Sequence, residues 1–278
     1  RTMRGLAGLA GCDMKTRIIT GLWSGAIFVT LIALGGSPFV ILMGVLALIG
    51  LSEFTLMRNH KLMAFPFLVT SLLVAFPFIL MLLERRLVLE ELPMSTTQWM
   101  VLGLMLLLFW TVVTKNRFTY EDASFYFVSA VYLVIGFSSF ALVRLSEDGL
   151  VKVLLVLFMI WATDSGAYFT GKAIGKTKLW PSISPNKTIE GAIGGIVSAI
   201  VLGIVYVLIE PVLPILEVLV LAVVVSVVGQ LGDLVQSAYK RQYNVKDSGH
   251  LLPGHGGILD RFDSMIAVFT VIWVFNLL

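Results

Sequence analysis

About nine stretches of this 278-residue sequence are apolar over the length that a helix needs to cross a bilayer. Such a helix takes roughly 20 consecutive apolar residues. Only 13% of the residues are charged and 58% are apolar, so a soluble chain of this length could not bury its apolar surface. The sequence therefore predicts an all-α polytopic integral membrane protein. The expected spans cover residues 18–34, 39–57, 62–83, 99–114, 123–143, 151–170, 189–209, 215–235 and 258–278.

Lys and Arg are distributed unevenly among the segments that join these spans. With nine spans, sixteen of the 20 Lys and Arg fall in the set of segments that includes the N-terminus, and four fall in the other set. Cytoplasmic loops of membrane proteins carry an excess of Lys and Arg, so the N-terminus is expected to be cytoplasmic. The same bias accounts for a pI near 9.0, and no nucleic-acid partner is expected.

The two halves of the chain differ in polar content. Residues 1–150 hold about five of the expected spans and are assigned to packing, with dimer contacts or lipid access as further roles. Residues 151–278 hold about four spans and most of the polar residues between spans, so the catalytic site is expected there, on the cytoplasmic side. Gly191 and Gly195, four residues apart, are expected to permit close helix packing.

Carboxylates occur near the ends of several apolar runs. A carboxylate at the bilayer centre costs about 2.5–3.5 kcal/mol on insertion scales, so such residues usually face a bundle interior and serve a function. For Glu53 the alternative of simple solvation by lipid headgroups stays open. In the expected topology all these acids lie at the cytoplasmic ends of their spans, at one depth: Glu53, Asp164, Glu190, Asp233, Asp260 and Asp263.

Helical spacing groups the acids of the last two spans. One face of the eighth helix carries four polar residues spaced i, i+3, i+4 and i+7: Asp233, Gln236, Ser237 and Lys240. Asp260 and Asp263 are three residues apart in the first turn of the last helix. Mg²⁺ takes one or two carboxylates and completes its shell with water and substrate phosphate. Asp233, Asp260 and Asp263 are therefore predicted to hold Mg²⁺, with a second cation left open.

Two polar segments carry a longer motif. The second runs Ser237-Ala-Tyr-Lys-Arg, Lys246-Asp247-Ser-Gly-His, Pro253-Gly-His-Gly-Gly and Asp260-Arg-Phe-Asp263, and it resembles the signature of the phosphatidate cytidylyltransferase (CDP-diacylglycerol synthase) family. The first, with Asp164-Ser-Gly-Ala-Tyr and Ser184-Pro-Asn-Lys-Thr-Ile-Glu-Gly, is similar to the same family. The resemblance implies a multi-pass enzyme of the bacterial plasma (inner) membrane, forming a homodimer. It also implies CTP and phosphatidic acid as substrates, CDP-diacylglycerol and pyrophosphate as products, and dependence on Mg²⁺.

The chemistry implied by this resemblance assigns roles to the polar residues. The second ionisation of a phosphomonoester has a pKa of about 6, so the attacking phosphate is already an anion and needs no general base. The barrier is repulsion between anions, which positioning and cations lower. The expected catalytic residues are Asp233, Asp260, Lys187, Lys240 and Arg241. The expected substrate-binding residues are Asp164, Ser184, Asn186, Ser237, Lys246, Asp247, His255 and Arg261.

Two other functions remain open at this point. A CTP-dependent lipid-alcohol kinase would use the same Mg²⁺ and lysines but transfer the terminal phosphate. An ion- or proton-coupled transporter would also use carboxylates within spans. The clustering of the acids at one surface, away from the midplane, disfavours the transporter.

Overall fold

The computed structural model describes residues 14–86, 95–249, 251, 254 and 256–278. These residues form nine helices and one short two-stranded sheet. The helices are α1 (Met14–Leu34), α2 (Gly36–Met57), α3 (Phe65–Arg86), α4 (Thr96–Val113), α5 (Tyr120–Leu145), α6 (Gly149–Ile174), α7 (Ile189–Ile209), α8 (Ile215–Gln242) and α9 (Leu259–Val274).

Seven of the described helices, α2 to α8, are long and apolar enough to cross a membrane. The apolar part of α1, Ile19–Leu34, and the 16-residue α9 are shorter. Large apolar side chains such as Phe109 of α4 and Leu208 of α7 are exposed on the outside of the protein, where lipid would cover them. The chain is thus an all-α, multi-pass membrane protein, as predicted.

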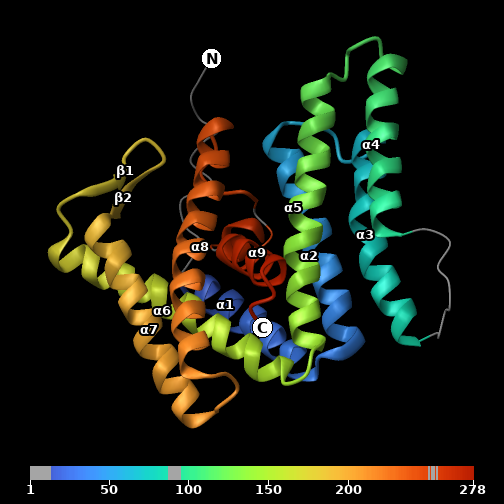
Figure 1. Ribbon diagram of the computed structural model, residues 1–278. Coiled ribbons are helices and arrows are strands. Elements are labelled where there is room, and N and C mark those ends of the chain that lie inside the picture. Colours follow the sequence, from blue (N-terminus) through green and yellow to red (C-terminus); the bar gives the residue numbers. More distant parts are fainter. Residues whose placement is uncertain (1–13, 87–94, 250, 252–253, 255) are drawn as a thin grey trace.

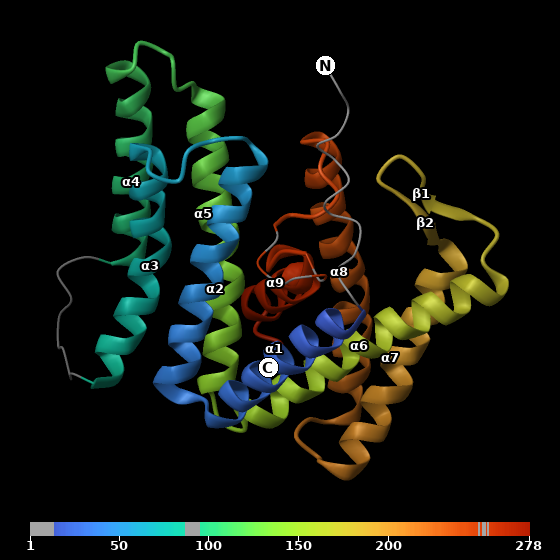
Figure 2. The same cartoon turned by 180° about the vertical axis from the view of Figure 1, so that it is seen from behind.

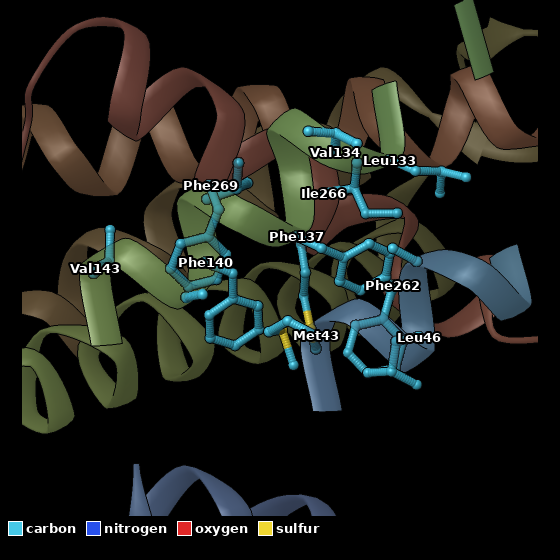
Figure 3. Close-up of a cluster of buried hydrophobic side chains, with 14 of the residues drawn as sticks. Met43, Leu46, Leu133, Val134, Phe137, Phe140, Val143, Phe262, Ile266 and Phe269 are labelled. Carbon is cyan, nitrogen blue, oxygen red and sulfur yellow. The ribbon is translucent and has the colours of Figure 1, made fainter. Parts of the chain in front are cut away.

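The centre of the protein is built from α2, α5 and α9. Figures 1 and 2 show α9 at the middle of the molecule, and it packs against α5 on one side and α8 on the other. Met43, Phe137 and Phe262 belong to the buried apolar cluster drawn in Figure 3. In the same cluster the rings of Phe140 and Phe269 stack with their centroids 3.9 Å apart. This packing fixes α9, whose first five residues include three of the predicted site residues, Asp260, Arg261 and Asp263.

Helices α6 and α7 pack with their backbones in close approach. A Cβ atom on Gly195 would lie 2.9 Å from the carbonyl oxygen of Thr163. A Cβ atom on Gly191 would lie 2.8 Å from the carbonyl oxygen of Ala167. Only glycine permits contacts of this kind, which are typical of small-residue interfaces between membrane helices. The packing role predicted for these two glycines is confirmed.

The segment between α6 and α7 forms a hairpin that the sequence pattern does not predict. Strands β1 (Lys178–Trp180) and β2 (Ser184–Thr188) pair antiparallel and extend beyond the ends of α6 and α7 (Figure 1). The carboxylate of Glu190 accepts hydrogen bonds from the backbone amides of Lys176 and Thr177, each at 3.1 Å. The hairpin is therefore anchored to the first turn of α7.

Candidate active site

A cavity of about 570 Å³ opens between α6, β2, α7, α8 and α9. Six of the residues predicted for the site line it, and they come from four different elements. Because α6, α8, α9 and β2 each contribute, the cavity exists only in the folded protein. The six are Asp164, Asn186, Lys187, Asp233, Asp260 and Asp263.

Asp233 on α8 is paired with the hairpin. The Nζ atom of Lys187 lies 2.5 Å from Oδ2 of Asp233, and both side chains are partly exposed. On the other side, the hydroxyl of Ser237 donates to Oδ1 of Asp233 over a longer 3.5 Å. The ion pair therefore holds the ammonium group of Lys187, on β2, at the wall of the cavity.

Asp260 on α9 is largely enclosed, with only 7% of its side chain exposed. Its Oδ1 atom accepts from Nζ of Lys240 at 2.7 Å. Its Oδ2 atom accepts from the backbone amide of Ser248 at 2.8 Å and from that of Gly257 at 3.1 Å. Gly256 adopts a left-handed backbone conformation with φ +81°, and a Cβ atom on it would lie 2.7 Å from Oδ2 of Asp260. Lys240 and two backbone amides therefore fix the orientation of Asp260, and the Ser248 hydroxyl lies within donor distance at 3.0 Å.

Three further carboxylates lie close enough to repel one another. Asp263 interacts electrostatically with Asp233 and with Asp164, and Asp164 interacts with Asp233. Lys187 attracts Asp164, and Lys240 attracts Asp263. The cavity therefore joins an acidic cluster to two ammonium groups, an arrangement suited to a cation together with an anionic ligand.

The donor set of the cavity fits Mg²⁺ as an ion shared between protein and substrate. Within the part of the chain that the structure describes, no three His, Cys, Asp or Glu side chains converge as a complete metal cage. Mg²⁺ needs only one or two carboxylates when phosphate and water supply its other ligands. Asp233 and Asp263 suit that role. The Oδ2 atom of Asp260 is already engaged by Ser248 and Gly257, so only Oδ1, which accepts from Lys240 alone, has capacity left for the ion.

Comparison with known sequences identifies the family. A sequence model described as the cytidylyltransferase family matches residues 15–278. The chain belongs to the cytidylyltransferase family. Every element that lines the cavity lies within the matched residues, so the cavity is a feature of the cytidylyltransferase region itself.

Three relatives of this cytidylyltransferase are each named phosphatidate cytidylyltransferase. The protein from Bacillus subtilis (strain 168) is 43% identical over 263 residues, covering 94% of this chain and 97% of the relative. The protein from Staphylococcus haemolyticus is 40% identical over 268 residues, with 93% and 97% covered. The protein from Staphylococcus aureus (strain COL) is 37% identical over 269 residues, with the same coverage. The family resemblance of the polar motifs is confirmed.

Other predicted residues of the cytidylyltransferase lie around the cavity. Lys240 donates a hydrogen bond to the cavity residue Asp260, and Ser237 donates one to the cavity residue Asp233. The Nε atom of Arg241 donates to the carbonyl oxygen of Ile183 in the hairpin at 3.4 Å. Ser184 is half-buried in β2, and His255 lies outside the described residues. The remaining predicted residues are exposed and do not line the cavity: Lys246, Asp247 and Arg261.

Several cavity residues of the cytidylyltransferase were not predicted. Tyr168 and Lys172 follow Asp164 by four and eight residues on α6, so helical spacing alone places them on its face. Gln230 lies one turn before Asp233 on α8, and its Nε2 atom donates to the carbonyl oxygen of Ala192 on α7 at 3.3 Å. The same spacing argument that grouped Asp233 with Lys240 would have found all three.

Proposed function

We propose that this chain transfers CMP from CTP to phosphatidic acid, giving CDP-diacylglycerol and pyrophosphate. The relatives that carry the name of this enzyme align with nearly the whole chain. The observation that carries the proposal is the cavity in which the acids of α6, α8 and α9 meet the ammonium groups of Lys187 and Lys240. Mixed charge of this kind suits a reaction between two phosphorylated substrates.

The proposed reaction is a substitution at the α-phosphorus of CTP. An oxygen of the phosphatidic acid phosphate forms the new bond, and the bond from the α-phosphorus to the oxygen that bridges to the β-phosphorus breaks. The nucleophile is anionic near neutral pH, so the residues act by positioning and charge neutralisation. An ammonium has three donors, so Lys187 can hold a phosphate oxygen while still paired with Asp233. Arg241 and Arg261 are proposed to neutralise phosphate from outside the cavity, and Asn186 and Ser237 to donate hydrogen bonds.

We propose that Asp233 and Asp263, with Asp260 beside them, hold the Mg²⁺ ion. A bound Mg²⁺ would stabilise the charge that develops on the departing pyrophosphate. The carboxylates contribute oxygen ligands, and Asp164 orients Lys187. A second cation could share the acidic cluster in the same way.

The location of the site also belongs to the proposal. We place the N-terminus and the cavity on the cytoplasmic side of the plasma membrane, with nine crossings that include α1 and α9. The distribution of Lys and Arg supports this orientation, and CTP is available on that side. We also propose a homodimer, which the mass of the protein in detergent would test.

Product analysis with two labels tests the reaction. The purified protein in vesicles that contain phosphatidic acid receives Mg²⁺ and CTP labelled on either the α- or the γ-phosphate. The α-label should enter the lipid, and the γ-label should appear in pyrophosphate. Lipid that carries the γ-label would instead indicate the lipid kinase, and unlabelled lipid in both reactions would overturn the proposed transfer.

A further inference from the structure

A buried carboxylate from the N-terminal half of the chain lies behind the cavity. Glu53 of α2 is only 3% exposed. Its Oε1 atom accepts from the backbone amide of Ile258 at 2.7 Å, and its Oε2 atom accepts from that of Leu259 at 2.9 Å. A buried charge is costly unless hydrogen bonds compensate it, so this arrangement is specific.

These two amides belong to the start of α9. The first N–H groups of a helix have no partner within the helix, and a capping side chain usually supplies one. The N-cap residue of α9 is Ile258, which has no side-chain oxygen. Glu53, 205 residues earlier in the chain, supplies the acceptors and a negative charge at the positive end of the helix dipole.

Ser248 connects Glu53 to the cavity. Its hydroxyl lies 2.9 Å from Oε2 of Glu53 and 3.0 Å from Oδ2 of Asp260, and it is buried. Having one proton, the hydroxyl donates to one carboxylate at a time. The backbone amide of Ser248 donates to Asp260 as well. If Glu53 moved, Ser248 would shift with it and would change the position of the Asp260 carboxylate.

Two glycines of the family motif allow this approach. A Cβ atom on Gly249 would lie 2.8 Å from Oε1 of Glu53. A Cβ atom on Gly257 would lie 2.5 Å from Oε2 of Glu53. A side chain at either position would collide with the carboxylate. Glycine at both positions therefore lets the backbone approach Glu53 closely.

We infer that Glu53 is a positioning residue of the active site, which fixes the first turn of α9 and, through Ser248, the carboxylate of Asp260. The inference rests on the proposed function, because that function makes the cavity the reaction site. Glu53 does not line the cavity and acts only through other residues.

The variant Glu53→Gln tests this role. Glutamine keeps the size but replaces one acceptor oxygen by an NH₂ group, so one amide of α9 loses its acceptor. We expect kcat for CDP-diacylglycerol formation to fall about tenfold to a hundredfold, the cost of a small misplacement in an active site. The KM for CTP should stay within about threefold, because the walls from α6, β2 and α7 are unchanged. Glu53→Asp keeps both acceptor oxygens and should recover part of kcat.

Asp122→Asn is the matched control. Asp122 is also an acid at a helix start in the N-terminal half, where it pairs with Arg58 at 2.6 Å and accepts from the amide of Thr119 at 2.9 Å. It does not line the cavity, so its loss should leave kcat per folded molecule unchanged. Wild-type kcat in Glu53→Gln, an equal loss in Asp122→Asn, or no recovery in Glu53→Asp would overturn the inference.

Two further measurements test the inference if Glu53→Gln folds poorly or if the wild-type protein is inactive in the assay. Ser248→Ala removes only the bridging hydroxyl, leaves the contacts of Glu53 with α9, and should lower kcat about threefold to tenfold. Amide hydrogen exchange in the peptide that contains Ile258 and Leu259 needs no substrate and should accelerate in Glu53→Gln but not in Asp122→Asn. If the wild-type protein makes no labelled lipid while this exchange still accelerates, the proposed function fails and the placement of α9 by Glu53 stands. Unchanged exchange overturns the inference in either case.

Discussion

Lys240 on α8 and Asp260 on α9 join their side chains at 2.7 Å, and only 18% and 7% of these side chains are exposed. The pair connects two helices at the rim of the cavity. Because Asp260 also holds the backbone at Ser248 and Gly257, the pair sets the position of a loop as well as of two helices.

Lys240→Met should destabilise the protein by about 3–5 kcal/mol, the usual cost of removing one partner from a buried ion pair. Thermal unfolding in detergent measures this loss. The double variant Lys240→Met/Asp260→Asn removes the uncompensated charge and should recover most of the stability without recovering activity. An active double variant would contradict a role of the pair in the reaction.

Asp233→Asn should lower the rate of CDP-diacylglycerol formation by about a hundredfold to a thousandfold, because a charge that stabilises the transition state is lost. We expect Asp260→Asn to be at least as severe, with both proteins still inserted and folded. Glu217→Gln is the control, since Glu217 lies in the first turn of the same helix as Asp233, about 24 Å away along its axis. Wild-type rates in both aspartate variants would remove the proposed metal site.

Lys187→Met should raise the KM for CTP about tenfold, which corresponds to one hydrogen bond from a charged donor. Steady-state kinetics at several CTP concentrations measures it. The matched control is Lys178→Met, because Lys178 is an exposed lysine on the other strand of the same hairpin. Equal kinetics of the two variants would argue against contact between Lys187 and the nucleotide.

Gly195→Ala should lower the free energy of unfolding by about 1–3 kcal/mol, because the added methyl group would press on the backbone of α6. Gly25→Ala provides the comparison: a Cβ atom there meets no atom within 4 Å, and alanine favours the helix by about 1 kcal/mol. Unfolding temperatures in one detergent should therefore shift in opposite directions. If Gly25→Ala lost stability and Gly195→Ala did not, the result would contradict the close packing of α6 and α7.

Local periodicity explains how much of the site could be predicted. The spacing of Asp233, Ser237 and Lys240 indicates one helix face, and α8 does continue to Gln242, well past the end of its apolar run. The apolar runs themselves indicate where most helices lie. These predictions need only the 3.6-residue repeat and the cost of exposing backbone groups to lipid.

The contact of Glu53 with a distant segment could not be predicted. Nothing near Glu53 in the sequence indicates that its partners lie some 200 residues later, because that pairing depends on how α2 and α9 pack. The hairpin was missed for a different reason. Its strands are short and include Pro185, which is unfavourable in a strand. No alternating apolar pattern therefore predicts them.

The contact of Glu53 with α9 has a consequence for dividing the chain. A fragment that begins after α5 would contain every residue of the cavity, yet its last helix would start with two amides whose acceptors lie on the missing fragment. Such a piece would be inert alone and would regain activity when the first five helices were co-expressed in the same membrane. The two halves would behave as complementing fragments rather than as a catalytic module with a detachable anchor.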